Sequence, residues 1–172
     1  MTFPDKKFTS ISEFAFTYFE QIKAAQASVD PDMLTAAFTL LDEAYKRGAT
    51  LYVCGNGGSA AISNHLVCDH SKCGQTDTVL RPKVVSLSTN IEMITAIAND
   101  ISYDDVFVYQ LKTLAEPDDV LITISCSGDS ENIVRAAHWA KNEKLSVISF
   151  TGFKGGRSAD LADINLQVDA DN

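Results

Sequence analysis

The sequence predicts an α/β fold, namely a doubly wound, mainly parallel sheet of five strands with helices on both faces. Short apolar runs recur that suit strands buried on both sides, and helix-compatible segments separate them. The 172 residues and the 45% hydrophobic content suit one domain with a sizeable core, and they exclude a disordered or fibrous chain. In such a sheet, ligands bind at the carboxyl ends of the strands.

Two helices are expected before the first strand. The first, at about residues 8–27, has a broad apolar face made of Phe14, Phe16, Tyr18, Phe19 and Ile22. That face predicts packing against another subunit or, more simply, against the chain's own domain. The second helix is expected to begin at Asp30-Pro31, with an acidic cap and a proline in its first turn, and to end at Lys46-Arg47-Gly48.

The rest of the chain alternates between strands and helices. Strands are expected at residues 50–54, 83–87, 120–124, 145–150 and 164–168. Helices are expected from the turn after the first strand to about Lys72, and at residues 91–98, 106–114 and 130–142. Residues 99–105 are predicted to form a polar turn, and residues 152–157 a loop.

Charge and composition argue against several functional classes. The formal net charge of −9 opposes sequence-independent nucleic-acid binding, which needs a basic surface. No apolar run approaches the roughly 20 residues that span a bilayer, and no apolar signal-peptide core follows Met1, so no membrane association is expected. The four cysteines, Cys54, Cys68, Cys73 and Cys126, form no C-x-x-C pair and are expected to be reduced thiols of a cytoplasmic protein.

The first candidate site is the turn Gly55-Asn56-Gly57-Gly58-Ser59, which joins an apolar strand to a helix. Glycine permits backbone angles that other residues avoid, and it leaves room for a ligand. The first amides of a helix have no partner within it, and the helix dipole favours negative charge there. The turn therefore predicts a phosphate site, and the alternative is a tight turn whose glycines serve packing alone.

The second candidate site, Ser125-Cys126-Ser127-Gly128-Asp129-Ser130, also follows a strand and opens a helix. Its serine hydroxyls and free amides suit the phosphate ester of a small molecule. The alternative is a turn capped by Ser130 and nothing more, although two such turns in one small sheet favour a ligand site. The P-loop pattern is missing, which disfavours nucleotide hydrolysis, and Ala60 in place of the last glycine of G-x-G-x-x-G argues only weakly against a dinucleotide.

His65 and Asp69 lie one turn apart on the helix predicted after the first turn, so their side chains share a face. An imidazole and a carboxylate at this spacing suit proton transfer or half of a metal site. A surface pair, or an aspartate bonded to nearby backbone, is the alternative. Cys68 is expected in the core, whereas His70 and Lys72 are expected to point outward.

Taken in order along the chain, these motifs resemble the sugar isomerase (SIS) domain family. The resemblance is carried by residues 55–59, His65, Asn99-Asp100, residues 125–130 and Thr151-Gly152, and it covers nearly the whole chain (residues 1–172) as a single domain. Within the family the motifs are most similar to the phosphoheptose isomerases, which interconvert sedoheptulose 7-phosphate and D-glycero-D-manno-heptose 7-phosphate. The resemblance implies an aldose–ketose isomerase of heptose biosynthesis.

The resemblance also implies roles for single residues. The sugar would be contacted by Asn56, Gly57, Gly58, Ser59, Asn99 and Asp100, and the phosphate by Ser125, Cys126, Ser127 and Ser130. His65 matches a family metal ligand, usually zinc, and is a candidate acid. Asp69 matches a glutamate that serves as catalytic base and metal ligand. The family forms homotetramers with active sites between subunits, which would explain the apolar N-terminal helix.

Three departures from the family pattern bear on these roles. Asp69 is one methylene shorter than the family's glutamate, which shortens its reach by about 1 Å. Cys126 replaces a threonine of the phosphate loop and so removes a hydroxyl. The chain stops at Asn172, before the family's C-terminal helix with its glutamine and histidine, so that helix is expected to be missing.

Two alternatives to the heptose phosphate isomerase are open. One is a non-catalytic sugar-phosphate-binding or protein-interaction module, of the type that associates with a replication initiator. The other is an isomerase for another sugar phosphate.

Overall fold

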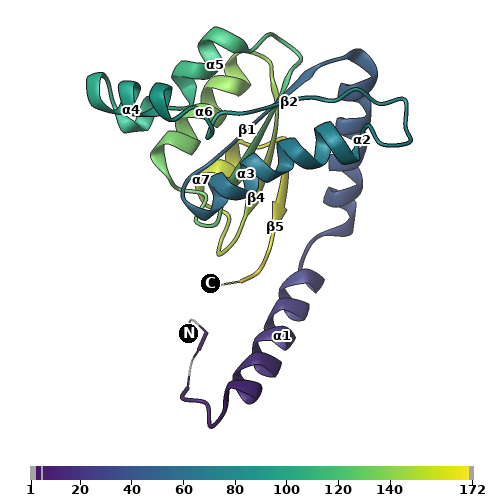
Figure 1. Cartoon of the computed structure of the whole chain (residues 1–172), viewed down its shortest axis with the longest axis vertical. Coiled ribbons are helices and arrows are strands. Elements are labelled where there is room, and N and C mark those ends of the chain that lie inside the picture. Colours follow the sequence, from purple (N-terminus) through teal and green to yellow (C-terminus); the bar gives the residue numbers. More distant parts are fainter. Residues whose placement is uncertain (1–2, 5, 171–172) are drawn as a thin grey trace.

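The protein's computed structural model describes residues 3–4 and 6–170, and within them it contains one sheet of five parallel strands. The strands are β1 (Thr50–Gly55), β2 (Lys83–Ser86), β3 (Val120–Ser125), β4 (Ser146–Thr151) and β5 (Ile164–Gln167). Their spatial order is β2-β1-β3-β4-β5, and the direction of winding changes between β1 and β3. The predicted α/β class and doubly wound sheet are therefore confirmed (Figure 1).

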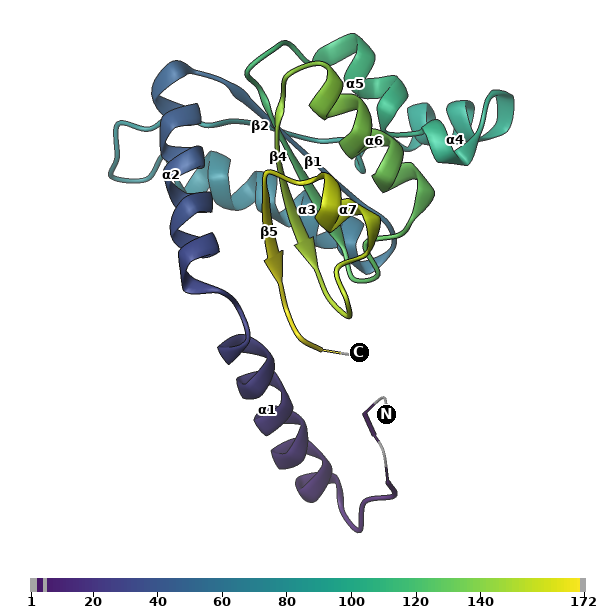
Figure 2. The same ribbon diagram turned by 180° about the vertical axis from the view of Figure 1, so that it is seen from behind.

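Helices cover both faces of the sheet. On one face lie α2 (Pro31–Arg47) and α3 (Gly58–Cys68), and α3 continues as one π-helical turn, η1 (Asp69–Cys73). On the other face lie α4 (Ile91–Asp100), the 3-10 turn η2 (Tyr103–Asp105), α5 (Val108–Leu114), α6 (Glu131–Asn142) and α7 (Gly156–Leu161) (Figure 2).

Two of the predicted connections are wrong. Asn99 and Asp100 form the last turn of α4 rather than a polar turn, because no glycine or proline interrupts the helix before Ile101. The loop expected at 152–157 contains the start of α7, since Gly155 and Gly156, both with positive φ, turn the chain into a short helix.

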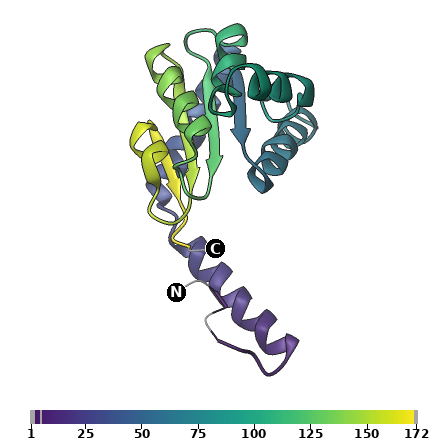
Figure 3. The same ribbon diagram turned by 90° about the vertical axis from the view of Figure 1, so that its left-hand side faces the viewer.

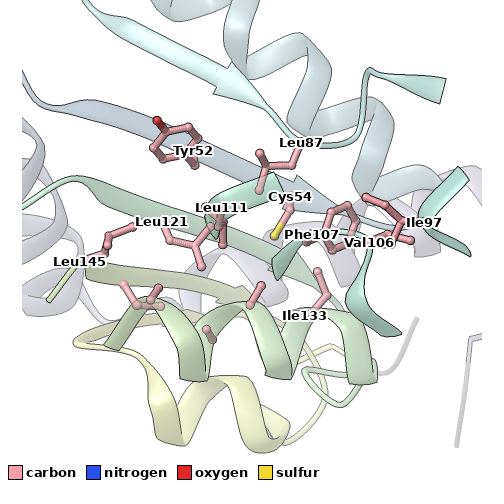
Figure 4. Close-up of a cluster of buried hydrophobic side chains, with 14 residues drawn as sticks. Tyr52, Cys54, Leu87, Ile97, Val106, Phe107, Leu111, Leu121, Ile133 and Leu145 are labelled. Atoms are coloured by element: carbon pink, nitrogen blue, oxygen red, sulfur yellow. The ribbon is translucent and has the colours of Figure 1, made fainter. Parts of the chain in front are cut away.

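Alternate side chains of the central strands point to opposite faces and form two apolar cores. Leu51 and Val53 of β1 face the helices α2 and α3, whereas Tyr52 and Cys54 face the layer that contains α4, α5 and α6. Figure 4 shows the second core, in which Cys54 and Leu121 of the sheet point toward the helix that carries Ile133. Full burial of one such aliphatic side chain contributes roughly 1.5–3 kcal/mol, so both helical layers are needed to hold the sheet and the turns at its edge.

Both ends of α2 form as predicted. The Asp30 carboxylate accepts hydrogen bonds from the amides of Asp32 (2.8 Å) and Met33 (3.4 Å), and Gly48 closes the helix in the left-handed conformation. All four cysteines are free thiols, as expected, but Cys68 is exposed rather than in the core. Within the described residues, no helix has both the length and the apolarity needed to cross a bilayer.

Helix α1 (Ile11–Ala27) projects away from the sheet domain (Figure 3). Phe14 and Tyr18 pack with the rings of Phe3 and Phe8 in the preceding segment. The other side of the helix stays exposed, and Phe16 has 73% of its surface accessible. The predicted apolar face exists, but the simpler expectation that it packs on the chain's own domain is wrong, since no side chain of α1 is buried.

Candidate functional site

The first predicted turn leaves β1 at Gly55 and enters α3 at Gly58. Gly57 takes the N-cap position with φ 54° and ψ −121°, a combination that residues with a Cβ rarely adopt. No side chain caps α3, and among the described residues nothing lies within 4 Å of a Cβ placed on Gly57 or Gly58. The start of this helix is therefore open to an anionic ligand.

The second predicted turn leaves β3 at Ser125 and enters α6 at Glu131. The Gly128 amide donates to the carbonyl (3.1 Å) and to the hydroxyl (3.2 Å) of Ser125, so the loop folds back on its own strand. Gly128 has φ 65°, and a Cβ there would lie 1.8 Å from the carbonyl oxygen of Gly155. Ser130 occupies the N-cap position as predicted, but its side chain makes no capping hydrogen bond, so its hydroxyl is available to a ligand.

The two turns line one cleft of about 560 Å³, because β1 and β3 are neighbours and Gly55 pairs with Ile124. The predicted residues that line it are Asn56, Gly58, Ser59, Ser125, Cys126, Ser127 and Ser130. Three apolar side chains that no motif had indicated, Ile62, Ile124 and Phe153, complete the lining. The carboxyl edge of the sheet thus carries a hollow that is lined by hydroxyls, by the starts of two helices and by three apolar side chains.

Asn99 and Asp100 lie outside this lining. Both are exposed at the end of α4, where Asn99 Nδ2 donates to Asp100 Oδ1 at 2.7 Å. Gly57 also lies outside the lining and contributes the backbone conformation of the first turn instead. The sugar-binding roles implied for Asn99 and Asp100 stay predictions.

Asn56 and Asn132 join the two turns through a reciprocal pair of amide hydrogen bonds. Asn56 Nδ2 donates to Asn132 Oδ1 (2.9 Å), and Asn132 Nδ2 donates to Asn56 Oδ1 (3.0 Å). Tyr103 Oη also donates to Asn56 Oδ1 (2.9 Å). No sequence motif predicts a role for Asn132 or Tyr103. The sequence signal available for Asn132 is the place of an asparagine on the buried face of α6, one turn before Ala136.

Two arginines hold the second turn and balance its acidic residues. Arg157 donates to Asp129 Oδ1 through its backbone amide (3.0 Å) and Nε (3.1 Å), and to Glu131 through Nη1 (2.9 Å). Arg135 bonds both Glu131 and Asp105 at 3.1 Å. The hydrogen bonds from Arg157 lower the pKa of Asp129 and that of Glu131. Because unpaired carboxylates at the start of α6 would repel an anion, these pairings suit the turn to phosphate.

His65 and Asp69 meet as predicted, on α3 and the π-helical turn that follows it. His65 Nε2 lies 3.4 Å from Asp69 Oδ1, and the two side chains are 73% and 55% exposed. Neither side chain lines the cleft. The imidazole and the carboxylate therefore lie on the surface beside the cleft rather than inside it.

The neighbouring His70 does not point outward as expected. Its Nδ1 makes a short hydrogen bond with the Tyr45 hydroxyl, and the two rings meet edge to face. His70 follows Leu66 by four residues and so lies on the same face of the helix, and both residues line a hollow shared with α2. Burial lowers the pKa of His70 and raises the pKa of Tyr45 to about 12.

The donor groups of the described residues do not form a complete zinc site. Zinc sites in proteins use at least three protein ligands in a tetrahedral arrangement. His65 and Asp69 supply two, and the described part of the chain holds no group of three or more His, Cys, Asp or Glu side chains placed for a metal. Any zinc bound here would need further ligands from outside these residues.

The SIS domain family model matches residues 17–152. The chain belongs to the SIS domain family. It is 35% identical over 156 residues to the phosphoheptose isomerase of Alteromonas mediterranea, with 89% of this chain and 78% of that protein aligned. It is 38% identical over 155 residues to a probable phosphoheptose isomerase of Thermoplasma acidophilum, with 90% and 84% aligned. The structure of a phosphoheptose isomerase from Francisella tularensis matches with a TM-score of 0.84 at 29% identity, over 96% of this chain and 88% of that one.

Proposed function

We propose that the protein is an aldose–ketose isomerase that converts sedoheptulose 7-phosphate to D-glycero-D-manno-heptose 7-phosphate. The observation that carries the proposal is the cleft in which two helix-opening turns meet at the carboxyl edge of the sheet. The similarity to phosphoheptose isomerases, at 35% and 38% identity, supports a heptose phosphate as the substrate. The four free thiols are consistent with a cytoplasmic site of action.

The second turn is proposed to hold the phosphate. The hydroxyls of Ser125, Ser127 and Ser130 belong to the cleft, and the backbone of Cys126 supplies an amide without the hydroxyl of a threonine. Each hydrogen bond to a charged group contributes roughly 1.5–3 kcal/mol, so a few of them give useful affinity without a lysine. The first turn, with Asn56, Gly58 and Ser59, then faces the sugar.

Asp69 is proposed as the catalytic base and His65 as the acid. The base removes a proton from the carbon beside the carbonyl, and the electrons of that C–H bond form the double bond of a cis-enediol while the carbonyl oxygen takes up a proton. A proton then returns to the former carbonyl carbon, while the hydroxyl on the first carbon gives up its proton and its oxygen becomes the carbonyl oxygen of the aldose. The 3.4 Å contact between His65 Nε2 and Asp69 Oδ1 keeps the two groups together.

Assembly into a homotetramer with active sites between subunits is part of the proposal. His65 and Asp69 are exposed beside the cleft, so a second chain would enclose them and exclude water from the reacting carbons. The exposed apolar side chains of α1, including Ile11, Phe16 and Phe19, supply a surface suited to such contacts. Zinc stays a prediction that requires ligands from outside the described residues, and the proton transfers assigned to Asp69 and His65 do not depend on it.

A coupled assay with sedoheptulose 7-phosphate, run with and without added zinc, tests the proposal. Turnover that is lost in Asp69→Asn, with phosphate binding retained, is the expected result. No turnover by the assembled protein, with sugar-phosphate binding intact, would instead favour a sensor or interaction module. A second panel of pentose and hexose phosphates decides whether another sugar is preferred.

A further inference from the structure

Phe153 combines a bulky side chain with a left-handed backbone. Its φ is 45°, a conformation that aromatic residues rarely adopt. The surrounding chain holds it from both sides, because the Phe153 amide donates to the Ala170 carbonyl (3.0 Å) and Gln167 Nε2 donates to the Phe153 carbonyl (3.0 Å). Backbone strain that is maintained by neighbouring bonds is concentrated at functional sites.

The position of Phe153 connects this strain to the cleft. Its side chain lines the cleft of about 560 Å³ and also a second, polar hollow of about 600 Å³ that includes Ser28, Lys154 and Gln167. The residue before it, Gly152, donates its amide to the Cys126 carbonyl at 2.9 Å. Phe153 therefore stands between the two hollows, with its turn bonded directly to the phosphate-binding turn.

We infer that Phe153 is a substrate-contacting residue that covers the phosphate end of the bound sugar and shields the hydrogen bonds of the second turn from water. The lining of the cleft includes no lysine or arginine among the described residues, so neutral hydroxyls and amides must hold the anion. Such bonds are stronger in a medium of low dielectric constant. Phe153 is 40% exposed, which leaves it surface to bury against a ligand.

The role of Phe153 toward the sugar rests on the proposed function, whereas its role toward the phosphate does not. The test therefore uses two ligands. Isothermal titration with inorganic phosphate measures the phosphate site alone, and steady-state kinetics with sedoheptulose 7-phosphate gives KM and kcat. Phe153→Ala removes the ring, Phe153→Gly also relieves the strained backbone, and Phe153→Leu keeps an apolar side chain. Lys144, with φ 66° in the turn before β4 and outside the cleft lining, supplies the matched controls Lys144→Ala and Lys144→Gly.

The alanine and glycine variants at position 153 are expected to raise the Kd of inorganic phosphate and the KM about tenfold, with kcat within about twofold of the parent. Phe153→Leu should recover most of the affinity, and both Lys144 variants should bind as the parent does. Parent-like phosphate affinity in both Phe153→Ala and Phe153→Gly would overturn the inference, as would the absence of phosphate binding by the parent. Phosphate binding that depends on Phe153, in a protein that turns over no heptose phosphate, would reject the isomerase but uphold the role of the ring.

Discussion

Replacing Asn132 by alanine tests how far the amide pair between the two turns supports the site. The change removes the 2.9 Å and 3.0 Å hydrogen bonds to Asn56 from a position that is 2% exposed. Each bond contributes about 0.5–1.5 kcal/mol net, and Asn56 Nδ2 loses its partner, so the free energy of unfolding should fall by about 2–3 kcal/mol. For a chain of this length, that corresponds to a fall in Tm of about 4–12 °C.

Urea unfolding measures the stability loss, and KM for the sugar phosphate measures the effect on the site. KM should rise several-fold, because Asn56 then keeps Tyr103 as its one side-chain partner among the described residues and no longer holds one orientation in the cleft. Ile133→Val is the matched control, since Ile133 is equally buried on α6 and its shortening costs about 0.5–1.5 kcal/mol without touching Asn56. A stability loss with unchanged KM in Asn132→Ala would refute the coupling of the turns, and unchanged stability would refute the bonds themselves.

Three further predictions concern the surrounding contacts. Arg157→Ala should weaken phosphate binding and lower the stability of the fold. This stability deficit should shrink as the pH falls below 4.5 and 3.8, the ordinary carboxyl pKa values, because the lowered pKa values of Glu131 and Asp129 stabilise the fold only above that range. Urea unfolding at several pH values checks this, and a constant deficit would contradict it. Tyr45→Phe should reduce the loss of stability that the parent shows between pH 10 and 12. A pKa of about 12 in the folded state means that the fold favours the neutral phenol of Tyr45, so the stability that this phenol contributes is lost as the pH rises. Identical alkaline unfolding curves for the two proteins would count against this. Gly128→Ala should lower the free energy of unfolding by about 3 kcal/mol or more, because the added Cβ would overlap the Gly155 carbonyl oxygen. A Tm within about 2 °C of the parent's in a thermal melt would contradict this.

Much of the fold follows from local patterns that act over a few residues. The buried strand at 120–124 and the capped helix at 31–47 were predicted because an apolar run or a cap leaves a short-range signal. The π-helical turn at 69–73 has no such signal. The contact of His70 with Tyr45 of α2 also depends on the tertiary structure. The helix α7 depends on how Gly155 and Gly156 pack against the loop at 127–128, which only the tertiary structure defines.

The site divides in the same way. The two turns were predicted because glycines and serines at strand ends mark an edge of the sheet that binds ligands. The residues that position those turns, Asn132, Tyr103 and Arg157, come from other elements and meet only after folding. Phe153 has a left-handed φ although it is not a glycine, so its residue type does not predict this backbone conformation.

The central claim is that this chain moves a proton between neighbouring carbons of a sugar phosphate, with Asp69 as the base. Incubation of sedoheptulose 7-phosphate with the protein in D2O, followed by mass spectrometry, measures this directly, because a proton that leaves carbon for a carboxylate exchanges with solvent, whereas a hydride passed directly between the two carbons does not. The account predicts deuterium on the carbon beside the carbonyl, retained in Asp69→Glu and abolished in Asp69→Asn. Interconversion of the two sugars without deuterium uptake, or uptake that persists in Asp69→Asn, would contradict it.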